Sequence, residues 1–171
     1  MNNDDVMSSQ RLAGLVSRYH VWQTTRRQNV AEHCWQVYRV YCALFGLPRA
    51  ELAYMILHHD SGEFAGPGDV PFSAKARVPG LKPRVDAAEL IGRERVGVDT
   101  FELTDLETNR LKVSDLVEMW EFAVEELARG NKFAEPIVTN VLEALDVVVA
   151  VSDVDTWQDI REHMKEYDRW K

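Results

Sequence analysis

Apolar residues along this chain recur mostly at intervals of three and four positions, the spacing that places side chains on one face of an α-helix. Residues typical of helix ends flank several of these runs. Asn29 with Glu32 matches a helix start, and Thr104 with Glu107 matches a capping box. The expected helices start behind Ser8 and Ser9 (reaching Tyr19), behind Asn29 (ending at Gly46), at Pro48, at Thr104 and at Pro136, with two more near Val85–Val96 and Trp157–Trp170.

The helical pattern breaks between Ser61 and Pro83, where glycine and proline recur too often for a continuous element. A long irregular segment of this kind is typical of a loop over a binding site, so we expect a substrate lid there. No alternating stretch long enough for a β-strand occurs. The sequence therefore predicts an all-α fold, a compact helical bundle that forms one domain over residues 1–171.

The charge and the two cysteines narrow the class of protein. The chain of 171 residues has a formal net charge of −8, which repels polyanions, so we expect no nucleic-acid partner. A small anionic substrate stays compatible with this charge, because bound cations invert the local potential. No apolar run is long enough to cross a bilayer, and no secretion signal is recognisable, so we expect no membrane partner. Cys34 and Cys42 lie in one helix-like stretch and cannot pair, which favours the reducing cytoplasm.

Two histidines and two aspartates from three separated stretches form a candidate metal site: His33, His59, Asp60 and Asp115. Imidazole and carboxylate ligands suit zinc, cobalt or manganese, and a set without cysteine leaves coordination positions open for water or substrate. Each residue also has an ordinary interpretation. His33 would be a hydrogen-bonded core histidine, Asp115 an exposed acid on an amphipathic helix, and the His59–Asp60 pair a polar helix end. For the neighbouring His58 we adopt the ordinary interpretation.

These four residues, in this order, resemble the H…HD…D signature of the HD-domain phosphohydrolases, which are compact all-helical proteins. The resemblance covers most of Arg18–Glu118. It includes the segments RQNVAEHCWQV, HHDSGEFAGPGDVPFSAK and KVSDLVE. These segments are similar to those of small bacterial 5'-deoxynucleotidases and of phage dATP triphosphohydrolases. The resemblance implies a divalent transition metal bound by the four residues.

The resemblance also implies roles for residues near the metal ligands. Residues that match Glu63 and Asp69 take part in the chemistry or hold additional metal ions. A residue that matches Lys75 contacts phosphate, and Arg18 matches a second phosphate ligand. The next positions imply substrate contacts as well, with Tyr19 against the nucleobase or sugar and Val21 near the sugar. The ordinary interpretation of Tyr19 and Val21 is that they pack the first helix onto the core, and for Trp22 we adopt it.

The expected activity is the cleavage of the 5' phosphoester of a deoxynucleotide, most specifically of dATP into deoxyadenosine and triphosphate. The alternatives are a 5'-deoxynucleotidase that acts on monophosphates, a non-catalytic nucleotide-binding module and a structural metal protein with a closed coordination sphere. We expect a cytoplasmic protein, located in the host cytoplasm if a phage encodes it. We also expect a homo-oligomer, because the last helix carries an apolar stripe that either closes the core or forms a subunit contact. The stripe consists of Trp157, Ile160, Met164, Tyr167 and Trp170.

Overall fold

The structure, a computed structural model, describes residues 3–65, 68–150 and 154–168. Within these ranges every regular element is a helix, so the expected all-α fold is confirmed. The elements are α1 (Asn3–Gly14), α2 (Val30–Phe45), α3 (Ala50–His58), the 3-10 helix η1 (Ser61–Ala65), α4 (Phe72–Arg77), α5 (Leu81–Arg95), α6 (Asp105–Ala128), the 3-10 helix η2 (Lys132–Ala134), α7 (Glu135–Ala150) and α8 (Val154–Asp168).

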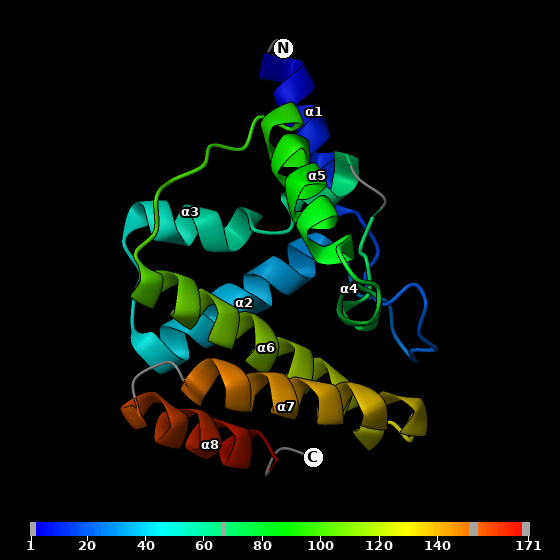
Figure 1. Cartoon of the computed structure of the whole chain (residues 1–171), viewed down its shortest axis with the longest axis vertical. Coiled ribbons are helices and arrows are strands. Elements are labelled where there is room, and N and C mark those ends of the chain that lie inside the picture. The colour runs from blue at the N-terminus through cyan, green and yellow to red at the C-terminus, as the bar shows by residue number, and fades with distance from the viewer. Residues whose placement is uncertain (1–2, 66–67, 151–153, 169–171) are drawn as a thin grey trace.

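The long helix α6 is the centre of the fold (Figure 1). It packs against α2 and α7, and α8 lies against the same group of helices. Apolar residues of α6 such as Val117 and Phe122 meet Leu145 of α7 and Ile160 of α8 in the main core. At the other end of the molecule, α1 and η1 pack together and η1 lies on α5 (Figure 1). The helices that carry the candidate site residues meet between these two groups.

Local sequence signals set the start of two helices that carry site residues. The Asn29 side chain accepts a hydrogen bond from the Glu32 backbone N–H at 2.9 Å, which satisfies one of the free donors at the start of α2. Thr104 and Glu107 form the expected capping box at the start of α6. His33 lies in the first turns of α2, so the cap that fixes the helix start also fixes the direction of this side chain.

The expected first helix is wrong at both ends. The helix α1 spans Asn3–Gly14, so Ser8 and Ser9 lie inside it, and Tyr19 lies beyond it with a backbone φ of 54°. The following loop is instead fixed by a buried acid of α6. Glu126 accepts hydrogen bonds from the backbone N–H and the hydroxyl of Thr25 at 2.6 and 2.7 Å. This long-range contact, which no local pattern reveals, holds the chain in a non-helical path.

The segment after Asp60 is more regular than expected, because it contains η1 and α4, and α5 already begins at Leu81. A close approach of two backbones requires glycine at Gly62 and at Gly92. A Cβ atom at Gly62 would lie 2.0 Å from the carbonyl oxygen of Glu89, and one at Gly92 would lie 2.1 Å from the Gly62 oxygen. The turn that follows the His59–Asp60 pair therefore rests directly on α5. The third helix also differs slightly from expectation, since it begins at Ala50 and not at Pro48.

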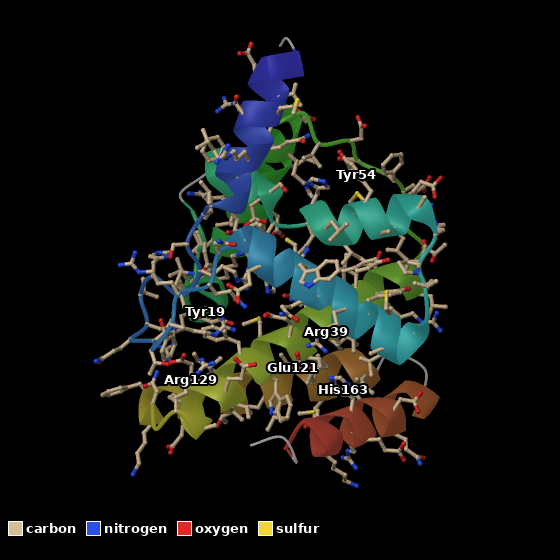
Figure 2. All side chains as sticks on the ribbon, turned by 180° about the vertical axis from the view of Figure 1, so that it is seen from behind. Tyr19, Arg39, Tyr54, Glu121, Arg129 and His163 are labelled. Atoms are coloured by element: carbon tan, nitrogen blue, oxygen red, sulfur yellow. The ribbon has the colours of Figure 1, made fainter. Side chains whose placement is uncertain are left out.

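A buried acid joins three helices away from the candidate site. Glu121 of α6 is 4 % exposed; it accepts one hydrogen bond from Arg39 of α2 and contacts the Nε2 atom of His163 of α8 at 2.7 Å (Figure 2). On α8, Ile160 is fully buried and Met164 packs against the same core. These two members of the apolar stripe therefore close the core of their own chain.

The other stripe members give no further information on self-association. Trp170 and the side chains of Trp157 and Tyr167 lie outside the described residues.

None of the described helices combines the length and the apolar character needed to cross a bilayer.

Candidate metal centre

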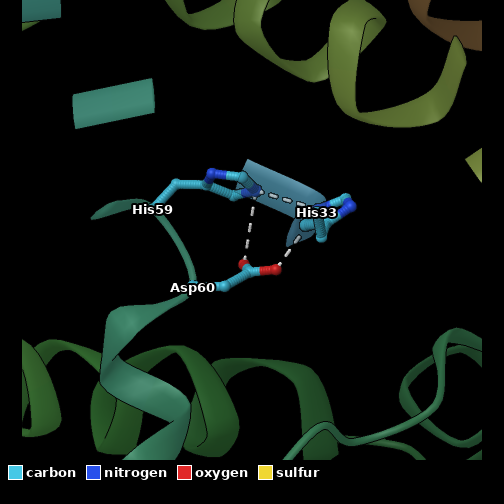
Figure 3. Close-up of side chains that lie close together, drawn as sticks. All are labelled: His33, His59 and Asp60. Carbon is cyan, nitrogen blue, oxygen red and sulfur yellow. Dashed lines mark hydrogen bonds and ion pairs between the residues drawn. The ribbon is translucent and has the colours of Figure 1, made fainter. Parts of the chain in front are cut away.

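Three side chains from two separate segments converge on one point. His33 comes from α2, while His59 and Asp60 follow the last residue of α3 (Figure 3). The Nε2 atoms of the two histidines are 3.3 Å apart. Asp60 lies 3.4 Å from His33 through Oδ2 and 3.5 Å from His59 through Oδ1. The possible ligand atoms of the three residues all lie within 4.8 Å of one another.

Asp115 of α6 completes the group on the side of His33. Its Oδ1 atom lies 3.3 Å from the Nε2 atom of His33, and its Oδ2 atom accepts a hydrogen bond from Lys112 at 2.6 Å. Nitrogen and oxygen atoms bound tetrahedrally to zinc at their usual bond lengths lie about 3.3–3.5 Å from one another. The separations within the group of His33, His59 and Asp60 therefore match the edges of a coordination polyhedron, and these three residues fit a divalent transition metal, whereas Asp115 joins them through its contact with His33.

Hydrogen bonds on the outer ring nitrogens direct both histidines toward this point. The Nδ1–H of His59 donates to the carbonyl oxygen of Ile56 at 2.7 Å. The Nδ1 atom of His33 lies 2.6 Å from Oε2 of Glu118, and the other oxygen of Glu118 accepts from Gln28 at 2.6 Å. Metal-binding histidines usually donate their second N–H to a carbonyl or carboxylate in this way, which leaves the Nε2 lone pair for the ion.

The electrostatic balance of the group favours a cation. Burial and Arg18 lower the pKa of His33, but the carboxylates of Glu118 and Asp115 outweigh them and raise it to about 9. Burial also lowers the pKa of His59, and Asp60 raises it to about 9. Burial raises the pKa of Asp60, but His59 and Arg18 outweigh it and bring it to about 2. Protonated imidazoles thus supply the positive charge that a bound ion would otherwise provide.

Glu63 of η1 lies next to the group and is almost fully buried, with 3 % of its surface exposed. Its Oε2 atom has no hydrogen-bond partner among the described residues. Burial, followed by the charge of Asp60, raises the pKa of Glu63 to about 9. Asp69 lies nearby and accepts a hydrogen bond from the backbone N–H of Tyr19 at 3.0 Å. A buried carboxyl group with a free oxygen can carry a proton or bind a cation.

Two cavities share Arg18, Asp69 and Met119 in their walls, and Arg18 also forms an ion pair with Asp60 of the candidate metal centre. The larger cavity is open and has a volume of about 630 Å³, and most of its lining residues carry charged side chains. His59, Asp60 and Asp115 form part of its wall, so the candidate metal point is accessible from it. The smaller cavity is narrow and mainly apolar. Its other lining residues are Tyr19, Trp22, Pro71, Leu116, Ile137, Asn140, Val141 and Ala144.

The substrate-binding candidates occupy different surroundings. Arg18 is 8 % exposed and forms an ion pair with Asp60, and Lys75 forms one with Glu89 at 3.2 Å. The Tyr19 ring is buried and stacks on Phe122, with the ring centres 4.4 Å apart and an interplanar angle of 3°.

Three further residues of the sequence analysis lie at the edge of the site or away from it. Val21 is 60 % exposed and is not among the lining residues of either cavity. Trp22 packs partly against the core, as expected, and also lines the narrow cavity. His58 lies 3.3 Å from the hydroxyl of Ser61 and outside the metal group, in line with its ordinary interpretation.

Several residues that the structure brings to the site were not identified from the sequence. Glu118 is 2 % exposed and orients His33, and Gln28 holds Glu118. Lys112 contacts Asp115, and Asn140 lines the narrow cavity. One sequence signal was available for Glu118. It follows Asp115 by three positions on one helix, where two acids share a face, and a second acid on an apolar face needs a partner.

Two solved structures share this fold. The HD phosphohydrolase DatZ of cyanophage S-2L, solved with dA and one catalytic Zn²⁺ ion, has a TM-score of 0.72 and 23% sequence identity over 95% of this chain and 94% of DatZ. A conserved hypothetical protein from Pyrococcus furiosus has a TM-score of 0.63 and 20% identity over 98% of this chain and 99% of that protein. No family model matches the chain, and no curated protein matches it. The chain therefore has the helical fold of the HD phosphohydrolase DatZ.

Proposed function

We propose that this protein is a metal-dependent phosphohydrolase that cleaves the 5' ester of deoxynucleotides. The observation that carries the proposal is a pair of cavities that share Arg18, Asp69 and Met119, a larger one at the candidate metal centre with mostly charged lining residues and a smaller one with mostly apolar lining residues. A nucleotide has the same two parts, an anionic phosphate chain and a flat heterocycle. The fold shared with DatZ, which was solved with dA and a catalytic Zn²⁺ ion, supports the same assignment.

The residues that would hold the ion are His33, His59, Asp60 and Asp115, and their nitrogen and oxygen atoms suit zinc, cobalt or manganese. A bound divalent ion supplies positive charge for the phosphate oxygens and activates water for attack on phosphorus. Arg18 would add a second positive charge at the point where the two cavities meet, since it lines both of them. Lys75, which lines the open cavity, would contact phosphate oxygens farther along the chain.

Glu63 is the proposed proton donor and acceptor. Its raised pKa of about 9 keeps the carboxyl group protonated at neutral pH in the metal-free protein. A carboxyl group in this state can give its proton to the departing 5' oxygen, and a positioned acid of this kind contributes roughly two to four orders of magnitude in rate. The second proposed role of Glu63, shared with Asp69, is to hold an additional cation. Both residues line the open cavity.

The specific substrate that we propose is dATP. Water would add to the α-phosphorus and the bond to the 5' oxygen would break, so that dATP and water give deoxyadenosine and triphosphate. The volume of about 630 Å³ supports a phosphate chain in place of a single phosphate group. Acids outnumber bases in the lining of this cavity, so triphosphate binding would require divalent cations. The acids are Asp60, Glu63, Asp69, Asp86, Glu89 and Asp115, and the bases are Arg18, Lys75, Lys82 and Lys112.

A product assay tests this proposal against the alternatives. The protein is incubated with Zn²⁺, Co²⁺ or Mn²⁺ and each of dATP, dAMP and the other deoxynucleotides, and the released phosphates are separated by ion chromatography. Triphosphate from dATP supports the proposal, whereas orthophosphate from dAMP alone supports a 5'-deoxynucleotidase. No phosphate product with any metal refutes the hydrolase. Glu63→Ala should abolish turnover and retain nucleotide binding, whereas a non-catalytic module would show no turnover in either form.

Location and assembly are secondary parts of the proposal. Deoxynucleotides are cytoplasmic metabolites, and both cysteines are free thiols, which supports the cytoplasm as the location. Self-association remains a prediction, and sedimentation of the purified protein measures it directly.

A further inference from the structure

The loop between α1 and α2 is closed at its base, next to the candidate metal centre. We term residues 17–29 the arginine loop, after Arg18 near its start. The first and last residues of the loop form an isolated antiparallel bridge, and the backbone N–H of Arg18 donates to the carbonyl oxygen of Gln28 at 2.9 Å. The Arg18 side chain is 8 % exposed and forms an ion pair with Asp60. The position of this guanidinium therefore depends on the path of the loop.

A residue with a strained backbone follows Arg18. The φ of Tyr19 is 54°, in the left-handed region that residues other than glycine rarely adopt. Its ring lies parallel to that of Phe122 of α6 with the ring centres 4.4 Å apart, and its backbone N–H donates to Asp69 at 3.0 Å. A residue keeps such a conformation only when its surroundings hold it there, and such residues cluster at functional sites. The contacts that hold the arginine loop therefore also decide the direction of Arg18.

The far end of the arginine loop is held by one buried acid. Glu126 of α6 is fully buried; it accepts hydrogen bonds from the backbone N–H and the hydroxyl of Thr25 at 2.6 and 2.7 Å and from the backbone N–H of Arg26 at 3.3 Å. The Asn131 side chain donates to Glu126 at 2.7 Å and to the carbonyl oxygen of Gln23 at 2.8 Å. Burial raises the pKa of Glu126, but the hydrogen bonds from Thr25 and Asn131 outweigh it and keep the pKa below its ordinary value. Glu126 is therefore ionised at neutral pH and holds the loop by charge-assisted hydrogen bonds.

We propose that Glu126 is a positioning residue for Arg18 and acts on it through the arginine loop. This role rests on the proposed function, in which Arg18 contacts phosphate. Arg18 lines both cavities, whereas Glu126 lines neither of them. An effect of Glu126 on a bound anion would have to pass through the protein, and the arginine loop is the segment that joins the two residues. The alternative is that Glu126 contributes only to the stability of the fold.

The first test needs no ligand and uses the metal-free full chain. Phenylglyoxal modifies accessible arginine side chains, and peptide mass spectrometry measures the rate at Arg18. Glu126→Gln keeps the size of the side chain but leaves a single acceptor oxygen, so we expect Arg18 to be modified at least about fivefold faster than in the wild type. Thr25→Val removes only the hydroxyl bond of an exposed residue and should give a smaller change in the same direction. The matched control is Glu121→Gln, a buried acid of the same helix with partners on α2 and α8, which should leave the rate at Arg18 unchanged.

The second test separates positioning from stability by a double-mutant cycle on the Zn²⁺-loaded full chain. Titration calorimetry measures the binding of inorganic tripolyphosphate. Glu126→Gln should weaken this binding about three- to tenfold. In the Arg18→Ala background the same substitution should have no further effect, because the loop then has no guanidinium to position.

A wild-type rate of Arg18 modification in folded Glu126→Gln would overturn the inference, and so would an equal acceleration in Glu121→Gln. A loss of tripolyphosphate affinity that persists in full in the Arg18→Ala background would also overturn it, since a purely structural role predicts that result. If Glu126→Gln does not fold, Thr25→Val decides by the same two measurements. A wild type that binds no tripolyphosphate would count against the proposed function, and the modification rate at Arg18 would still decide the inference.

Discussion

Replacement of Glu118 by glutamine should weaken metal binding without a direct change to any proposed ligand. Glu118 accepts two hydrogen bonds, one from Gln28 at 2.6 Å and one from the His33 ring, whose Nδ1 atom is also 2.6 Å away. A glutamine side chain has only one acceptor oxygen, so one of these donors would face an N–H group. A lost hydrogen bond to a charged group costs about 1.5–3 kcal/mol.

The expected effect on the metal follows from that cost. His33 would lose either the partner that fixes its ring or the charge that makes the ring a stronger ligand. Loss of such a partner typically weakens metal affinity about 10- to 100-fold, which corresponds to about 1.4–2.7 kcal/mol. The measurement is a Zn²⁺ titration against a competing chelator at fixed pH, for the wild type and for Glu118→Gln.

Glu121→Gln is the matched control for this experiment. Glu121 lies three positions farther along the same helix and is also buried, but its partners are Arg39 and His163 and not the metal group (Figure 2). We expect this variant to lose stability while its metal affinity stays unchanged. A folded Glu118→Gln protein with wild-type metal affinity would refute the reasoning, and so would equal losses of affinity in the two variants.

Two further predictions concern pH and packing. The pKa values of His33 and His59 are about 9 in the metal-free protein, compared with the ordinary value of 6.5. Because a metal ion must displace these protons, metal affinity should rise between pH 6.5 and 9, and binding should release protons. Calorimetry in buffers of different ionisation enthalpy measures this release. The sign is opposite for the metal-free protein, whose melting temperature should fall as pH rises through this window, because a raised folded-state pKa stabilises only the protonated form. Gly62→Ala would place a Cβ atom 2.0 Å from a carbonyl oxygen of α5, so we expect at least about 2 kcal/mol of lost stability in denaturant unfolding. Gly68→Ala, with no atom within 4 Å, should lose only the roughly 1 kcal/mol of its left-handed backbone.

Parts of the fold followed from sequence because their causes are local. The cap of Asn29 on α2 and the capping box of Thr104 depend on residues three positions away, and both helices begin where the pattern predicts. The first helix was misjudged because its boundary is not local. Glu126, about a hundred positions away, holds the loop through Thr25 in a path that the apolar spacing around Tyr19 does not indicate.

The candidate site also has features that were visible in the sequence and features that depend on tertiary packing. The order and residue types of His33, His59, Asp60 and Asp115 were readable in the sequence, and they carried the resemblance to HD-domain phosphohydrolases. The separations of 3.3–3.5 Å between their ligand atoms come from the packing of α2, α3 and α6. The partners of these residues were harder to identify, because a buried acid and an exposed acid look alike in a sequence, and for Glu118 the only signal was its spacing of three positions from Asp115.

The sequence by itself determined that the chain is helical, where the capped helices α2 and α6 begin, and which residue types were available to bind a cation. Only the tertiary structure decided which acids are buried, which imidazole nitrogens face one another, and that a smaller cavity shares Arg18, Asp69 and Met119 with the larger one beside the candidate metal centre. The physical reason is the distance along the chain over which each kind of interaction acts. Helix caps and apolar spacing act within one or two turns, whereas burial and pKa depend on groups that folding brings together from distant positions.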